Sequence, residues 1–177
     1  MNGVFKFYDI NASEDRRAFE NNEVPSQYCN PLSIDNAVHQ SMYQTITPIV
    51  RTHEEATFLT VGDGKYGSDA NFLLSLGCRV TASNLAVESL KEAHAKGWIE
   101  EWLEINVEDI ALPDCAFDFI LCKHTYHHLP RPPLGLYEML RVAKRGVILI
   151  EPLDNQAAPF FVSEEFIKRA APKRRKI

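Results

Sequence analysis

The chain has 177 residues, of which 45% are hydrophobic and 24% charged, and its formal net charge is −5 at pH 7. A chain of this size and apolar content is predicted to form one folded unit with a substantial core. The acidic balance argues against a nucleic-acid partner. The basic run Lys173–Lys176 is interpreted as a solvated terminus rather than a phosphate-binding patch.

The four cysteines contain no Cys-x-x-Cys pair, and neither a secretory signal nor an apolar run of membrane-spanning length is found. We therefore expect a reduced, cytoplasmic protein with no membrane partner. No metal site is predicted: three histidines lie within Lys123–His128, but no second group of ligands accompanies them.

The first third of the chain is the least regular. Residues 1–32 are polar and are expected to be irregular, with a short helix around Ser13–Glu20. Pro48 is expected to lie in the connection to the first strand. Between these segments a helix is predicted to begin at the cap Ser33. It presents four apolar residues on one face: Ile34, Val38, Met42 and Ile46.

From residue 57 onwards, strands and helices alternate. Strands are predicted at Thr57–Val61, Cys78–Ser83, Trp102–Val107, Phe117–Cys122 and Gly146–Glu151. Helices are predicted between them at Ser68–Leu76, Ala86–Ala95 and Leu134–Ala143. This alternation predicts an α/β fold with a doubly wound, mostly parallel sheet and helices on both faces, and the continuously apolar runs Phe119–Cys122 and Val147–Ile150 are typical of strands buried on both sides.

Only five strands are found, and one further helix, Ser163–Ala170, is predicted beyond them. The last strands of such a fold are missing, so the chain is predicted to be either a minimal version of it or the leading part of a longer chain. A missing edge hairpin would leave a sheet edge exposed, and homo-oligomers are expected to form through that edge.

The run after the first predicted strand, Gly62-Asp-Gly-Lys-Tyr-Gly67, has the spacing Gly-x-Gly-x-x-Gly. Its glycines let the backbone approach a ligand closely, and the first N–H groups of the following helix favour polar or anionic groups. In this strand–turn–helix context the run predicts a nucleotide-type cofactor site. Two classes of enzyme fit: nicotinamide oxidoreductases and methyltransferases that use S-adenosyl-L-methionine (SAM).

A series of segments distinguishes these classes, because in order and spacing it resembles the motifs of class I SAM-dependent methyltransferases. The series covers roughly residues 55–155 and includes the family's glycine turn, second-strand motif, acidic loop with Phe-Asp, and fifth strand. Its segments are Phe58–Gly67, Val80–Leu85, Val107–Cys122, His127–Pro130 and Tyr137–Pro152.

The resemblance implies three parts of the chain. Residues 53–155 would be a Rossmann-like core that binds SAM, residues 1–52 a helical lid on the substrate side, and residues 156–177 a C-terminal helix with a basic tail. The implied reaction is transfer of a methyl group to a small-molecule acceptor. Tyr126–Pro132 is also similar to methyltransferases associated with sugar and surface-polysaccharide assembly, which implies a sugar-containing acceptor.

The cofactor-binding residues implied by the resemblance follow the ends of the first four strands. They are Gly62, Asp63, Gly64, Lys65, Gly67, Asn84, Leu85, Asn106, Val107, Glu108, Lys123 and His124. For Asp63 two roles stay open: accepting a hydrogen bond from the SAM ammonium, or serving only as a turn residue.

Asn84 departs from the family pattern. An acid usually stands at the end of the second strand, where it accepts hydrogen bonds from the ribose hydroxyls. Asparagine can accept one such bond, but without the assistance of a charge. Asn84 therefore keeps open a non-catalytic or truncated relative that acts as a binding or scaffold module. The NAD-dependent oxidoreductase alternative would require an acid at this position.

Tyr126, His127 and His128 are the candidate catalytic residues, in the segment that follows the fourth predicted strand. A histidine is suited to take a proton from an acceptor hydroxyl, although either ring could equally hydrogen-bond within the loop. Glu151 and Asp154, at the end of the fifth strand, are expected to reach the substrate.

Overall fold

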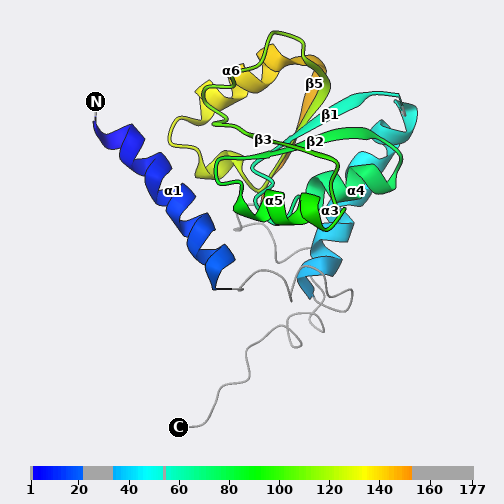
Figure 1. The fold of residues 1–177 in the computed structure, drawn as a ribbon. Helices are drawn as coiled ribbons and strands as arrows, with labels where there is room; N and C mark the ends of the chain where they lie inside the picture. The colour runs from blue at the N-terminus through cyan, green and yellow to red at the C-terminus, as the bar shows by residue number, and fades with distance from the viewer. Residues whose placement is uncertain (1, 22–33, 54, 153–177) are drawn as a thin grey trace, which may run out of the picture.

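The structure, a computed structural model, describes residues 2–21, 34–53 and 55–152. In these residues five strands form one parallel sheet in the order β3-β2-β1-β4-β5 (Figure 1). They are β1 (Thr57–Val61), β2 (Arg79–Asn84), β3 (Glu101–Glu104), β4 (Phe117–Lys123) and β5 (Ala143–Ile150). The strand order reverses between β1 and β4, which makes this place the topological switch point of the sheet.

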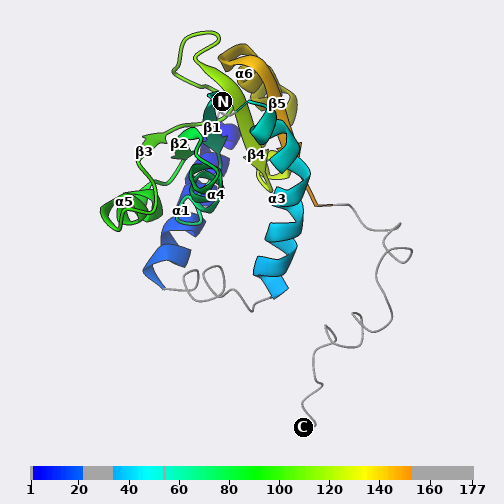
Figure 2. The same ribbon diagram turned by 90° about the vertical axis from the view of Figure 1, so that its right-hand side faces the viewer.

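Helices cover both faces of the sheet (Figures 1 and 2). One face carries α3 (Ile34–Thr52), α4 (Ser68–Ser75) and α5 (Glu88–Ala95), and the other carries α6 (Pro132–Val142). A short 3₁₀ helix, η1 (Tyr126–His128), follows β4. The predicted α/β doubly wound fold is thus confirmed.

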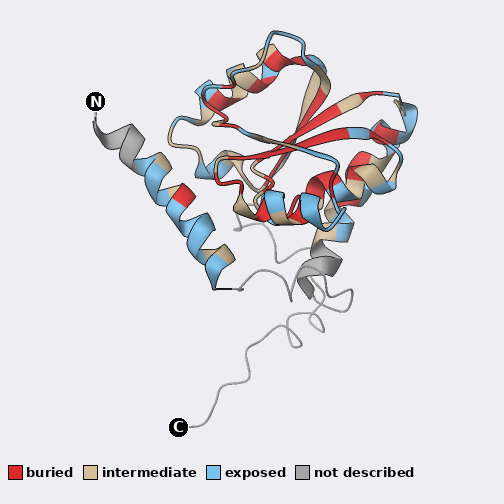
Figure 3. Ribbon diagram, in the orientation of Figure 1, coloured by how far each residue is buried: buried red, intermediate tan, exposed pale blue. Residues whose placement is uncertain are grey.

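The core follows from the alternation of side chains along the buried strands. Phe58 packs among the helices of one face, whereas its neighbours Leu59 and Val61 pack with Met139 of α6 on the other. The buried residues accordingly concentrate in the sheet and on the helix surfaces that face it (Figure 3). Within the described segments, no helix is long and apolar enough to cross a bilayer.

Two expectations for the first third of the chain were wrong. A regular helix, α1 (Asn2–Glu20), replaces most of the predicted irregular segment, because Ala12 is buried and Phe19 packs onto the core. Helix α3 continues through Pro48, which is exposed, so the proline removes one backbone hydrogen bond of the helix without its ring entering the core. Ser33, Asp154 and Ser163–Ala170 lie outside the described residues.

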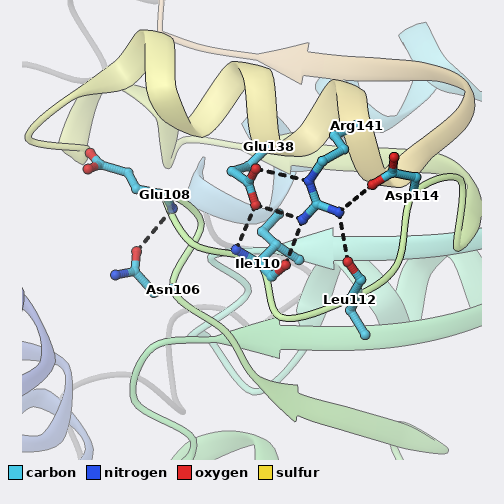
Figure 4. A network of polar contacts seen from close by, with 7 residues as sticks. All are labelled: Asn106, Glu108, Ile110, Leu112, Asp114, Glu138 and Arg141. Carbon is cyan, nitrogen blue, oxygen red and sulfur yellow. Dashed lines mark hydrogen bonds and ion pairs between the residues drawn. The ribbon is translucent and has the colours of Figure 1, made fainter.

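A polar network around Arg141 of α6 holds the loop between β3 and β4 (Figure 4). Its guanidinium donates to the carbonyl oxygens of Ile110 at 2.7 Å and Leu112 at 2.8 Å. It also pairs with the carboxylates of Glu138 at 2.7 Å and Asp114 at 2.8 Å. The Glu138 carboxylate in turn accepts the N–H of Ile110 at 3.0 Å. The loop that leaves β3 is therefore fixed to α6 by backbone and side-chain bonds together.

Replacing Arg141 by methionine is expected to lower the free energy of unfolding by clearly more than an ordinary surface substitution does, since several hydrogen bonds from a charged donor are lost. Arg141→Lys should recover only part of this loss, because an ammonium cannot reproduce the planar fork of the guanidinium. Urea unfolding measures both variants. The matched control is Arg51→Met, at an exposed arginine of α3, which should stay within about 0.5 kcal/mol of the wild type. An equal loss in the control variant would contradict the role of the network.

Candidate functional site

A cavity of about 340 Å³ opens at the carboxyl ends of the strands, a volume within the usual range of small-molecule sites. Its walls come from the turn after β1, the end of β2, the loop after β3, the segment after β4 and one side of α1. The first and fourth of these flank the topological switch point, where open α/β sheets bind their ligands.

The turn after β1 needs glycine at the positions that face this cavity. Gly62 has a φ of 71°, and a Cβ there would lie 2.1 Å from the Oγ1 of Thr125. A Cβ on Gly64 would lie 2.6 Å from the Nδ2 of Asn84. Bare backbone is therefore the only fit between the ends of β1, β2 and β4, which leaves that backbone close to any ligand in the cavity.

The side chain of Asp63 accepts hydrogen bonds from residues around the glycine turn. Its Oδ1 accepts the N–H of Asp69 at 3.1 Å. Its Oδ2 accepts the N–H of Ala70 at 2.9 Å and the hydroxyl of Thr60 at 2.9 Å. The carboxylate thus caps the start of α4 and is 2% exposed. Of its two predicted roles, the local one is the role that these bonds support.

Burial, together with the neighbouring Asp69 carboxylate, raises the pKa of Asp63 to about 7. In the unfolded chain an aspartate titrates near 4, so between about pH 4 and 7 the folded state holds a proton that the unfolded state has lost. This stabilisation is complete below about pH 4 and is lost as the pH rises through about 7. Asp63→Asn is expected to flatten the dependence of unfolding free energy on pH by up to about 1.4 kcal/mol per pH unit within this window.

Urea unfolding between pH 4 and 8 measures the effect, and Asp9→Asn on the exposed side of α1 is the control. The profile of this control should run parallel to that of the wild type. A parallel profile for Asp63→Asn would contradict the assignment of the proton to this residue.

A buried ion pair lies behind the glycine turn. The Nζ of Lys123, at the end of β4, is 2.9 Å from the Oδ1 of Asp69, and the two side chains are 5% and 4% exposed. The hydroxyl of Tyr43 on α3 donates to the same carboxylate oxygen at 2.6 Å. Lys123 borders the cavity, but its ammonium is engaged by Asp69 and joins β4 to α4 and α3.

His127, in the segment after β4, lines the cavity and is held by Glu151. The Nδ1 of His127 contacts the Oε2 of Glu151, and the Oε1 of Glu151 accepts the N–H groups of Thr125 at 3.2 Å and Tyr126 at 3.0 Å. Glu151 is thus held by two backbone donors and in turn orients the imidazole. With its N–H on Nδ1, the ring presents Nε2 as an acceptor.

Comparisons with known proteins agree with this arrangement. Residues 59–150 match the model of the family described as "Methyltransferase domain". The chain belongs to this family. Its fold and its glycine turn are those expected of a class I SAM-dependent methyltransferase.

Solved structures with this methyltransferase fold come from several organisms. A protein of Bacillus halodurans described as a candidate methyltransferase is 26% identical, with a TM-score of 0.55 over 67% of this chain and 55% of its own. A SAM-dependent methyltransferase of Aquifex aeolicus is 24% identical, with a TM-score of 0.50 over 73% and 82%. The [4+2]-cyclase SpnF is 17% identical, with a TM-score of 0.54 over 64% and 47%. The chain thus spans about half the length of two of these proteins. Among curated protein sequences, none matches significantly.

Most of the predicted site residues line this same cavity. That they bind SAM stays a prediction. They come from the ends of β1, β2 and β4 and from the loop after β3. They are Gly62, Asp63, Gly64, Lys65, Asn84, Leu85, Asn106, Val107, Lys123, His124, His127 and His128.

Four residues that were predicted to reach a ligand do not line the cavity, and one of them is Glu151, which holds His127. Gly67 begins α4, where a Cβ would lie 2.7 Å from Ile99, so its role is close packing. Tyr126 packs onto the core beneath α6. The buried carboxylate of Glu108 accepts hydrogen bonds from the hydroxyl of Tyr8 and from Arg131, and thereby ties α1 to the loop after β3.

Sequence reasoning predicted a helical lid in residues 1–52 but named none of the residues of α1 and α3 that line this cavity. Tyr8, Asn11 and Asp15 of α1 and His39 of α3 line the cavity. The signal was the helical spacing of Tyr8, Ala12, Asp15 and Phe19, which mixes polar with apolar residues on one face. Burial of His39 lowers its pKa to about 4, with the charge of Lys123 as the next cause, so this ring is neutral at pH 7.

Proposed function

We propose that this methyltransferase domain transfers the methyl group of SAM to a small-molecule acceptor. The observation that carries the proposal is that the glycine turn and His127, whose ring contacts Glu151, line one cavity. A cavity of about 340 Å³ walled by α1 suits a small molecule better than a polymer segment.

The residues of the turn fit SAM. Bare backbone at Gly62 and Gly64 borders the cavity, as a bulky cofactor requires. Asn106 and Val107, in the loop after β3, also line the cavity and are the residues proposed to contact the adenine ring. SAM supplies an activated methyl group, so orientation of the acceptor accounts for much of the rate.

His127 is the proposed general base. Its Nδ1–H is held by Glu151, so Nε2 is the atom that receives a proton from an acceptor hydroxyl. The Glu151 carboxylate then stabilises the imidazolium that forms. Glu151 keeps its place because Thr125 and Tyr126 donate to its other oxygen.

The test is transfer of label from methyl-tritiated SAM by the purified full chain. The acceptors are panels of hydroxylated small molecules, with sugars as a separate panel because of the resemblance of Tyr126–Pro132, and mixed protein and RNA as controls. We expect label in a small-molecule panel. The panel of sugars tests the finer expectation of a sugar-containing acceptor. Label in protein or RNA alone, or in none of the panels, would contradict the proposal.

The detection of transferred methyl is essential, because one fold hosts several chemistries. SpnF, which shares this fold, is described as a [4+2]-cyclase rather than a methyltransferase. A chain that binds SAM without transferring label would support the binding or scaffold alternative that Asn84 raised.

A further inference from the structure

The end of β2, where the family pattern places an acid, receives a carboxylate from another element. The Nδ2 of Asn84 donates to the Oδ2 of Asp15 on α1 at 2.9 Å. Asp15 and Asn84 both line the cavity. A Cβ on Gly64 would lie 3.3 Å from the same Asp15 oxygen, so this carboxylate lies over the glycine turn.

Asn84 is oriented so that it holds this carboxylate. Its Nδ2 donates to the carbonyl oxygen of Ala86 at 2.8 Å as well as to Asp15. Both partners are acceptors, which fixes the amide nitrogen on this side. Asp15 is exposed along the cavity wall, and within the described residues its Oδ1 has no hydrogen-bond partner, so this oxygen is left to accept from a ligand.

Helix α1 is positioned so that it delivers Asp15. Tyr8, Ala12, Asp15 and Phe19 are spaced by four, three and four residues, so they share one face of the helix. Tyr8 bonds to Glu108, Ala12 is buried, and Phe19 packs 6.0 Å from the ring of Tyr66. Contacts on both sides of Asp15 therefore turn this face of α1 towards the domain.

We infer that Asp15 is the carboxylate that accepts hydrogen bonds from the ribose hydroxyls of the cofactor, in place of an acid on β2. The asparagine at position 84 is then explained by the presence of Asp15, to which it donates a hydrogen bond. An aspartate at position 84 would set two carboxylates against each other at 2.9 Å, whereas an amide bonds to Asp15 and holds it. The inference rests on the proposed function, because it requires that the cavity binds SAM.

Calorimetric titration of the full chain with S-adenosylhomocysteine tests the inference. Asp15→Asn should weaken binding about tenfold to hundredfold, the usual effect of losing hydrogen bonds to a charged acceptor. Asp9→Asn removes the same charge from an exposed position of α1 and should leave the affinity unchanged. The exchange variant Asp15→Asn with Asn84→Asp returns the acid to β2 and should recover most of the lost affinity, whereas Asn84→Asp alone should weaken binding.

The second ligand is an analogue of S-adenosylhomocysteine that lacks both ribose hydroxyls. The wild type should bind it more weakly than the parent, whereas Asp15→Asn should discriminate between the two ligands much less than the wild type, which a variant with merely disturbed folding would not do. If Asp15→Asn binds like Asp9→Asn, or still discriminates between the ligands like the wild type, the inference is wrong and the proposed function stands. If the folded wild type binds neither ligand, the proposed function fails and the inference fails with it.

Discussion

Replacement of Lys123 by methionine is expected to lower the free energy of unfolding by about 3–5 kcal/mol at neutral pH, since removing one partner of a buried ion pair leaves the other charge unpaired. The Asp69 carboxylate, 4% exposed, would keep the Tyr43 hydroxyl as its donor but lose the ammonium at 2.9 Å. Asp63 lies next to it and adds repulsion. Urea unfolding at pH 7 measures the loss.

Two further variants make this result specific. Lys144→Met, at an exposed lysine of β5, should change the free energy of unfolding by less than about 0.5 kcal/mol. Combining Lys123→Met with Asp69→Asn removes both charges and should recover more than half of the loss of Lys123→Met. A loss below about 1 kcal/mol for Lys123→Met, or strict additivity in the double variant, would show that the pair is not coupled as its geometry requires.

The second large effect is on the rate of methyl transfer. His127→Ala is expected to lower kcat by about 10²- to 10⁴-fold, the usual contribution of a general base, and to leave the affinity for S-adenosylhomocysteine unchanged. Glu151→Gln keeps the shape of the side chain but loses the charge that stabilises the imidazolium, so we expect a smaller loss of at least about tenfold. The measurement is the initial rate of transfer of tritiated methyl to the acceptor found in the small-molecule panel.

His128→Ala is the matched control for this base. Its ring lies 3.9 Å from that of His127, and it lines the same cavity without the contact to Glu151. We expect it to lose less than tenfold in kcat, since it lacks an orienting carboxylate. Equal losses in the two histidine variants, or a His127→Ala enzyme of wild-type rate, would remove His127 from the role of base.

The core of the fold was predictable because its signals are local. β1, β4 and β5 each contain a short apolar run, and Gly77 and Gly97 follow the ends of α4 and α5. Their positive φ values, 84° and 73°, are the conformations that glycine supplies at such helix ends. The element bounds therefore shifted by only a few residues between prediction and structure.

The parts that were not predicted depend on contacts between residues far apart in the chain. The exposed residues of helix α1 are mostly polar. Its position is fixed by contacts such as that between Tyr8 and Glu108, which are 100 residues apart. Asp15 and Asn84 are 69 residues apart. Residue patterns within one element cannot show such pairs. From the sequence alone, Asn84 was therefore interpreted as the loss of an acid, whereas in the structure it hydrogen-bonds to Asp15.

Glu108 is a second residue whose role could not be predicted from local sequence, in this case because a predicted cofactor ligand bonds to the protein instead. The resemblance assigned it to the cofactor, but its carboxylate is enclosed by Tyr8 and Arg131, which come from α1 and from the residue before α6. A carboxylate that is satisfied by protein donors has little left to offer a ligand. Whether an acid in a predicted site binds ligand or protein is decided by elements that the motif does not include.

Calorimetric titration of the folded wild-type chain with S-adenosylhomocysteine, with NAD in a parallel experiment, tests the cofactor assignment most directly. The structure and the family predict micromolar binding of S-adenosylhomocysteine and none of NAD. Binding of NAD instead, or of neither ligand by protein whose folding is shown by cooperative urea unfolding, would contradict the assignment of this cavity to SAM.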